Sequence, residues 1–93
     1  MDVLEAQFRQ EMVHAGASSV TVWGNAPGHA YPAHSHDYRK ILCCLEGGIV
    51  FGLADREVPL AVGDRMVIEP GARHSASVGP DGVRCAEAHF REP

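Results

Sequence analysis

Three of the six histidines are spaced so that they could bind one metal ion. His34 and His36 are two residues apart, so in an extended strand both imidazoles project from the same face. His74 follows a Pro70-Gly71 turn much later in the chain, so a second strand could bring it to the same place. Neutral imidazole suits zinc, iron and nickel, and three protein ligands leave a coordination position open for water or substrate. Taken alone, the histidine pair also fits exposed or hydrogen-bonded side chains on an edge strand.

The elements that would position these histidines are short strands. After Gly16 the sequence changes to short runs rich in Val, Ile, Thr and aromatic residues, interrupted by Gly, Pro and Asp. This texture is typical of a sandwich or barrel, and it disfavours alternating strands and helices. The expected strands are Ser18–Trp23, Ala30–His36, Arg39–Leu45, Ile49–Leu53, Glu57–Leu60, Arg65–Ile68, His74–Val78 and Val83–Phe90. Turns are expected at Glu46–Gly48, Ala54–Arg56 and Gly79–Gly82.

One short helix is expected before the strands, over residues 2–14. Leu4, Phe8 and Met12 recur at intervals of four residues, which places them on one apolar stripe. Such a stripe is typical of a packing face, so we expect it to cover one face of the sheet. The chain is then a single domain with a helix and a barrel, residues 1–16 and 17–93.

Two stretches that contain the histidines resemble the signature motifs of a known family. From Gly28 the sequence reads G-HAYPA-H-S-H-DYR-K-ILCCLE-G, and from Gly63 it reads G-DRMVI-E-P-G-AR-H. They resemble the two motifs of the cupin superfamily, and together they span about half of the chain. The resemblance implies an all-β fold, a small double-stranded β-helix (jelly-roll) barrel. It also implies that His34, His36 and His74 are the metal ligands.

Two positions depart from the cupin pattern. The family usually has a glutamate ligand four residues after the second histidine, where this chain has Lys40, and a family proline is replaced by Glu69. The chain therefore resembles the small three-histidine cupins, and short bacterial cupins that carry an N-terminal helix. This implies one divalent transition metal, with zinc as the first expectation and iron, nickel or manganese as alternatives.

Five further residues are candidates to line a ligand pocket. By strand parity Lys40 points inward, where a metal and the loss of water both disfavour its charged form unless an anion pairs with it. Glu69 and Glu87 are the candidate partners; alternatively, Lys40 binds the anionic group of a small molecule. Tyr38 could donate a hydrogen bond to a metal-bound water, or simply close the barrel core. Glu87 and His89 share one face of the last strand, and either could be a fourth ligand if that face is inward.

Composition excludes two classes of partner. The net charge of −4 disfavours nucleic acid, because phosphate binding needs a basic face. No apolar run approaches the ~20 residues that a membrane-spanning helix needs. The N-terminus lacks the basic and apolar regions of a signal peptide, so a cytoplasmic protein is expected.

The apolar outer face of one predicted strand indicates a homodimer. Ile41, Cys43 and Leu45 alternate with Lys40, so this strand is apolar on its outer face as well. The predicted helix is short and should cover only part of that face. A second subunit would cover the rest and would support the small core of a chain of this length.

Three functions are compatible with these features. The chain could be a metal-binding protein that holds a small anionic molecule, and this is the function we predict. The alternative is a metalloenzyme of the dioxygenase or isomerase type, acting on a small chelating substrate. A metal-free scaffold is the third. Whether the protein is an enzyme is left open, because cupins include both enzymes and binding proteins.

Overall fold

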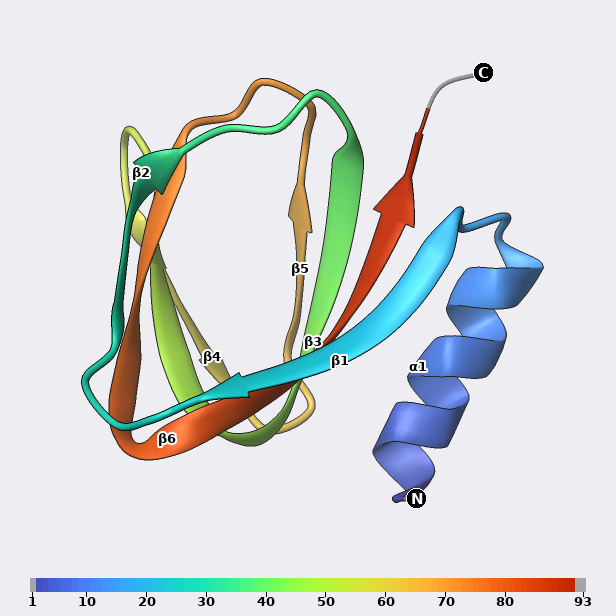
Figure 1. The fold of residues 1–93 in the computed structure, drawn as a ribbon, viewed down its shortest axis with the longest axis horizontal. Coiled ribbons are helices and arrows are strands. Elements are labelled where there is room, and N and C mark those ends of the chain that lie inside the picture. The colour runs from blue at the N-terminus through green and yellow to red at the C-terminus, as the bar shows by residue number, and fades with distance from the viewer. Residues whose placement is uncertain (1, 92–93) are drawn as a thin grey trace.

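One helix and six strands make up residues 2–91, the part of the chain that the computed structural model describes. In chain order they are α1 (Val3–His14), β1 (Ser19–Asn25), β2 (Ala30–His34), β3 (Arg39–Gly52), β4 (Glu57–Ala61), β5 (Arg65–Ile68) and β6 (His74–Phe90). The strands pair antiparallel throughout. The expected all-β barrel with a short N-terminal helix is confirmed (Figure 1).

Two long strands, β3 and β6, form the frame of the barrel. They pair from Arg39 opposite Phe90 to Gly52 opposite Ser75, so each strand crosses the whole barrel. The first part of β3 is flanked by β5, and the facing part of β6 by β1, which gives one sheet with the order β1-β6-β3-β5. The remaining parts of the same strands are flanked by β4 and β2, which gives a second sheet, β2-β6-β3-β4. The two sheets enclose the interior between them (Figure 1).

Two of the three expected turns are wrong, because the chain does not reverse there. β3 continues through Glu46–Gly48 and β6 continues through Gly79–Gly82, while Ala54–Arg56 does join β3 to β4. The pairing of β3 with β6 shifts register between Cys44 and Glu46 and again between Gly47 and Ile49, which marks a bend in both strands. Gly47 has a φ of 70°, and a Cβ there would lie 2.0 Å from the carbonyl oxygen of Gly82. These glycines therefore let two paired strands bend at close approach instead of ending them.

The helix α1 packs on the outer face of the sheet that contains β1. The carboxylate of Asp2 accepts a hydrogen bond from the backbone N–H of Glu5 at 2.7 Å, which caps the helix. Phe8 and Met12 of the expected stripe are buried in an outer cluster, together with Cys43, Leu45, Ala86 and Ala88. No helix within residues 2–91 is long and apolar enough to cross a membrane.

This packing removes the reason for expecting a second subunit on that face. Cys43 and Leu45 were expected to be left uncovered, but their exposed fractions are 0% and 5%. Ile41 is also partly buried beside the outer cluster. The helix of the same chain supplies the cover, so the homodimer stays a prediction without support from these residues.

A second cluster fills the interior between the two sheets. Its buried members include Leu42, Cys44, Ile49, Phe51, Leu60, Met66, Ile68, Ala76, Val78, Val83 and Cys85. Cys44 faces inward, as its parity predicts, and is fully enclosed in this core. Part of this cluster forms the floor of the cavity that lies beside the histidines.

The helix is expected to be essential for stability. Replacing Phe8, which is fully buried, with Ala should lower the free energy of unfolding by about 3–5 kcal/mol, because it leaves a cavity under the helix. Replacing Val13, which is 63% exposed on the same helix, with Ala should change it by less than about 0.5 kcal/mol. Urea unfolding followed by circular dichroism measures both. Equal urea midpoints for the two variants would show that the helix does not pack as described.

Candidate metal centre

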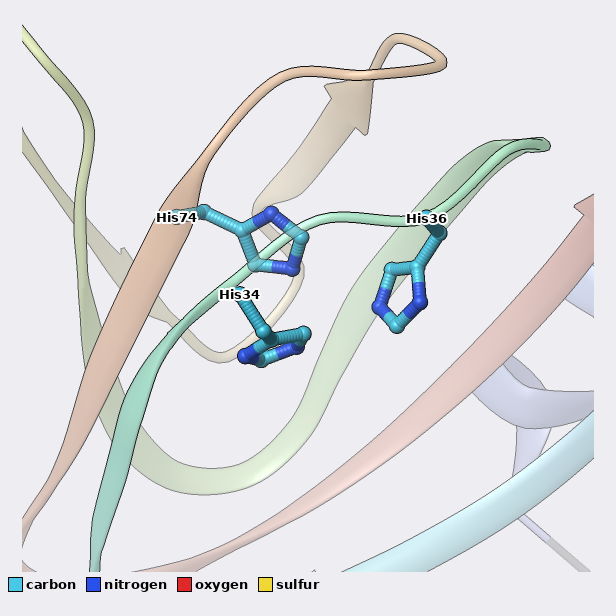
Figure 2. A group of neighbouring side chains, drawn as sticks. All are labelled: His34, His36 and His74. Atoms are coloured by element: carbon cyan, nitrogen blue, oxygen red, sulfur yellow. The ribbon is translucent and has the colours of Figure 1, made fainter.

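The three histidines come together because β2 pairs with the start of β6. His34, the last residue of β2, lies directly opposite His74, the first residue of β6. His36 lies beyond the end of β2, in the loop that leads to β3, so the expected strand is two residues too long. The carbonyl oxygen of His36 accepts a hydrogen bond from the N–H of Gly71 at 2.7 Å, which ties this loop to the turn before His74. Figure 2 shows the three imidazole rings gathered on the inner side of these segments.

The three rings are close enough to share one ion. Each histidine offers a ring nitrogen within 4.8 Å of those of the other two. The ring centroids lie 4.3 Å apart for His34 and His74, 4.8 Å for His34 and His36, and 5.2 Å for His36 and His74. Nitrogens bound to one tetrahedral ion at about 2.1 Å would be about 3.4 Å apart, so small ring rotations would complete the site.

Hydrogen bonds fix which nitrogen of two histidines faces the centre. Nδ1 of His34 lies 2.8 Å from the carbonyl oxygen of Pro32, and Nδ1 of His74 lies 2.9 Å from that of Ala72. A carbonyl oxygen only accepts, so each Nδ1 carries the proton and donates it. The lone pair is then on Nε2, the nitrogen available to a metal. Ligating histidines are commonly held through their other nitrogen in this way.

Two ring nitrogens of the three histidines are buried without a hydrogen-bond partner. Nε2 of His36 and Nε2 of His74 are inaccessible to solvent and make no hydrogen bond. Burial lowers the pKa of both side chains, and the positive charge of Lys40 lowers each further. Both imidazoles are therefore neutral at physiological pH. A buried ring nitrogen without a partner is costly unless something binds it, so the donor set fits a transition metal.

Lys40 faces inward and pairs with Glu87. Its Nζ lies 3.4 Å from Oε1 of Glu87, and the side chains are 11% and 12% exposed. The other candidate partner, Glu69, is exposed beside the Pro70-Gly71 turn and is not among the residues that line the cavity, so its expected pocket role has no support from the structure. Lys40 lies opposite Ile68, the last residue of β5, so Glu69 already lies outside the paired strand. On its other side β3 pairs with β6, which brings Glu87 next to Lys40.

Glu87 is the most connected polar residue of this region. Besides Lys40, it accepts hydrogen bonds from Nε1 of Trp23 at 2.9 Å and from Nε2 of His89 at 2.6 Å. Burial raises the pKa of Glu87, but the hydrogen bond from His89, the charge of Lys40 and the hydrogen bond from Trp23 together lower it below the usual range. The carboxylate is therefore ionised in the folded protein.

Tyr38 and His89 lie at the edge of the histidine group. The ring of Tyr38 stacks on His36 with centroids 4.9 Å apart, its centroid lies 4.4 Å from that of His89, and the guanidinium of Arg91 lies over it at 4.3 Å. Glu87 and His89 share a face of β6, as expected, and of the two only Glu87 is among the residues that line the cavity. They bond to each other, and neither belongs to the set of three convergent ligand atoms.

A cavity of about 260 Å³ adjoins the three histidines. Its polar lining includes Lys40 and Glu87, and its other walls are Trp23, Asn25, Tyr31, Leu42, Ile49, Phe51 and Ala76. Trp23, Asn25 and Tyr31 were not among the pocket residues expected from the sequence. Trp23 and Asn25 share strand parity on β1, but nothing local in the sequence indicates which face of that strand is inward.

The sequence matches the cupin domain family over residues 21–84, more than half of the chain. The chain belongs to the cupin family. No curated protein matches this cupin. A protein of unknown function from Rhizobium leguminosarum has a similar structure, with a TM-score of 0.74 and 15% identity, covering 78% of this chain and 69% of its own.

Two further structures resemble this cupin. A cupin-2 domain protein from Shewanella frigidimarina has a TM-score of 0.67 and 19% identity, covering 77% of this chain and 69% of its own. The cupin domain of Schizosaccharomyces pombe Cnp3 has a TM-score of 0.75 and 16% identity, covering 83% of this chain and only 58% of its own. At these identities the likeness establishes the double-stranded β-helix fold, and this cupin is shorter than each of the three.

Replacing Lys40 with Glu should strengthen zinc binding by about tenfold or more, because the change removes a cation beside the site and adds an oxygen donor. Without metal, the variant should be less stable than the wild type, since two carboxylates would then share a buried site. Competition with a chromogenic chelator measures the affinity, and thermal unfolding measures the stability.

Arg39→Glu is the matched control. It makes the same change of charge one residue earlier on β3, where Arg39 stacks over Phe90 at 4.7 Å on the outer face. Zinc affinity should stay within about twofold of the wild type, because solvent screens that position. An equal gain in both variants would mean that only net charge matters and that position 40 does not reach the centre.

Proposed function

We propose that this cupin binds one divalent transition metal through Nε2 of His34, His36 and His74, and that the bound metal holds a small anionic molecule. The observation that carries the proposal is the pair of buried, unpartnered Nε2 atoms on His36 and His74, which point toward the same centre as His34. Zinc is the first expectation for three neutral imidazoles, with iron, nickel or manganese as alternatives.

The residues around the centre support binding of a second molecule. Three protein ligands leave positions where a bound metal would accept an oxygen donor. The three histidines also line the cavity, so a molecule in the cavity would have direct access to those positions. The carbonyl oxygens of Pro32 and Ala72 hold the rings of His34 and His74 in place before any metal arrives.

A three-histidine metalloenzyme is the second candidate, with activity of the dioxygenase or isomerase type on a small chelating substrate. The open positions beside a cavity favour it, since a substrate in the cavity could bind the metal directly. Metal identity distinguishes the two functions: iron in protein purified anaerobically without an affinity tag would favour the oxygenase, and zinc would favour binding alone.

Metal binding itself is tested by stoichiometry. Purified protein should bind about one zinc per chain, measured by elemental analysis after dialysis against a metal buffer. Replacing His34 or His74 with Ala should abolish tight binding at neutral pH, because two imidazoles hold zinc far more weakly than three. His14→Ala, on the exposed end of α1, is the control and should keep full occupancy.

Full occupancy in the His34→Ala/His74→Ala double variant would falsify the assignment of the site.

The homodimer and the cytoplasmic location stay predictions. Sedimentation at several concentrations tests the first, and a strictly monomeric protein at high micromolar concentration would contradict it.

A further inference from the structure

The positive charge in the cavity is already neutralised by a residue of the same chain. Lys40 lies 3.4 Å from Glu87, and that carboxylate also accepts from Trp23 and His89. The short contacts of the Glu87 carboxylate are thus all with donors of the same chain. The opposite charges of Lys40 and Glu87 cancel, so the pair has no net charge. A second anion next to Lys40 would also lie next to Glu87 and would be repelled by it. Lys40 is therefore not the site that binds the negative group of a ligand.

The remaining walls of the cavity are mostly apolar. Leu42, Ile49 and Phe51 come from β3, with exposed fractions of 1%, 2% and 5%, and Ala76 comes from the facing strand β6. Trp23 and Tyr31 form an aromatic wall, with ring centroids 5.8 Å apart in an edge-to-face arrangement. At the Tyr31 end, the side-chain amide of Asn25 donates to the hydroxyl of Tyr31, which leaves the Tyr31 O–H as a donor and the Asn25 carbonyl oxygen as an acceptor, both of them uncharged.

The length and volume of the cavity limit the size of the ligand. Tyr31 precedes His34 by three residues of β2, and the pairing is irregular between them, so the aromatic wall lies within roughly 10 Å of the histidines along the strand. The cavity volume of about 260 Å³ lies just below the range of about 300–1,000 Å³ that is usual for pockets of drug-sized molecules.

We infer that the ligand of this cupin is a small monoanion with an apolar body. Its single anionic group binds the metal at the three histidines, and its hydrocarbon or aromatic body lies against Phe51, Ile49 and Trp23. Dicarboxylates and phosphorylated molecules are disfavoured, because a second anionic group would meet no unpaired cation among the residues that line the cavity. This inference rests on the proposed metal site and adds the class of molecule that the site selects.

Two 2-hydroxy acids of equal size test the inference. 2-Hydroxy-4-methylpentanoate and malate carry the same metal-binding end and differ in an isopropyl group against a carboxylate. Each is titrated into the full chain loaded with cobalt(II), whose visible spectrum reports both metal binding and a change of ligands. We expect 2-hydroxy-4-methylpentanoate to bind at least about tenfold more tightly than malate.

The Glu87→Gln variant tests the role of the ion pair. It keeps the shape of the side chain and an acceptor for Trp23, but it leaves Lys40 without its anion. The preference should shift toward malate by about tenfold or more, because the second carboxylate can now pair with Lys40. Glu69→Gln is the matched control at an exposed glutamate, and it should keep the preference of the wild type.

The results of these titrations distinguish a failure of the ligand inference from a failure of the metal site. If wild-type protein gives no cobalt spectrum, the proposed metal site fails, and the inference fails with it. If the spectrum forms but malate binds as tightly as 2-hydroxy-4-methylpentanoate, or neither acid changes it, the metal site stands and the inference about ligand class is overturned. An unchanged preference in Glu87→Gln would likewise overturn the neutralising role of Glu87.

Discussion

β3 and β6 pair antiparallel over almost their full lengths, and the positions of the other strands follow from this pairing. Because both strands belong to both sheets, their register fixes how every other strand attaches. β2 docks on the start of β6, which sets His34 opposite His74. β1 docks on the end of β6, which brings Trp23 opposite Cys85 and within reach of Glu87. The metal centre and the far wall of the cavity are thus two results of one pairing.

The same pairing explains the charge distribution of the cavity. Leu42 on β3 lies opposite Glu87 on β6, and Lys40 lies opposite His89, so the lysine and the glutamate are diagonal neighbours on the inner face. The family's usual glutamate ligand would stand where this chain has Lys40. Here a carboxylate is supplied by the adjacent strand and is bound to protein donors. Three imidazoles are available to a metal, and the charges of Lys40 and Glu87 beside them cancel. The apolar walls of the cavity then determine which molecule can bind next to the metal.

The outer face shows how a short chain can complete its own packing. Phe8 and Met12 of α1 cover Cys43 and Leu45, and Arg65 extends the contact by stacking over the ring of Phe8 at 5.2 Å and pairing with Glu11 at 2.5 Å. The hydrogen bond lowers the pKa of Glu11, which keeps that carboxylate charged. The helix therefore protects the face opposite the cavity, and the barrel interior can contain a hollow instead of a fully packed core.

The helix, the strand-rich barrel and the choice of three histidines could be predicted from the sequence. They follow from short-range features: a stripe at intervals of four residues, glycine and proline positions, and two motifs at fixed spacing. Three other features could not be predicted without the fold: Glu87 and not Glu69 pairs with Lys40, Gly47 and Gly82 bend strands instead of ending them, and Trp23 faces inward. Each of these depends on which strands lie side by side. Strand pairing joins residues far apart in the chain, and local periodicity contains no information about that register.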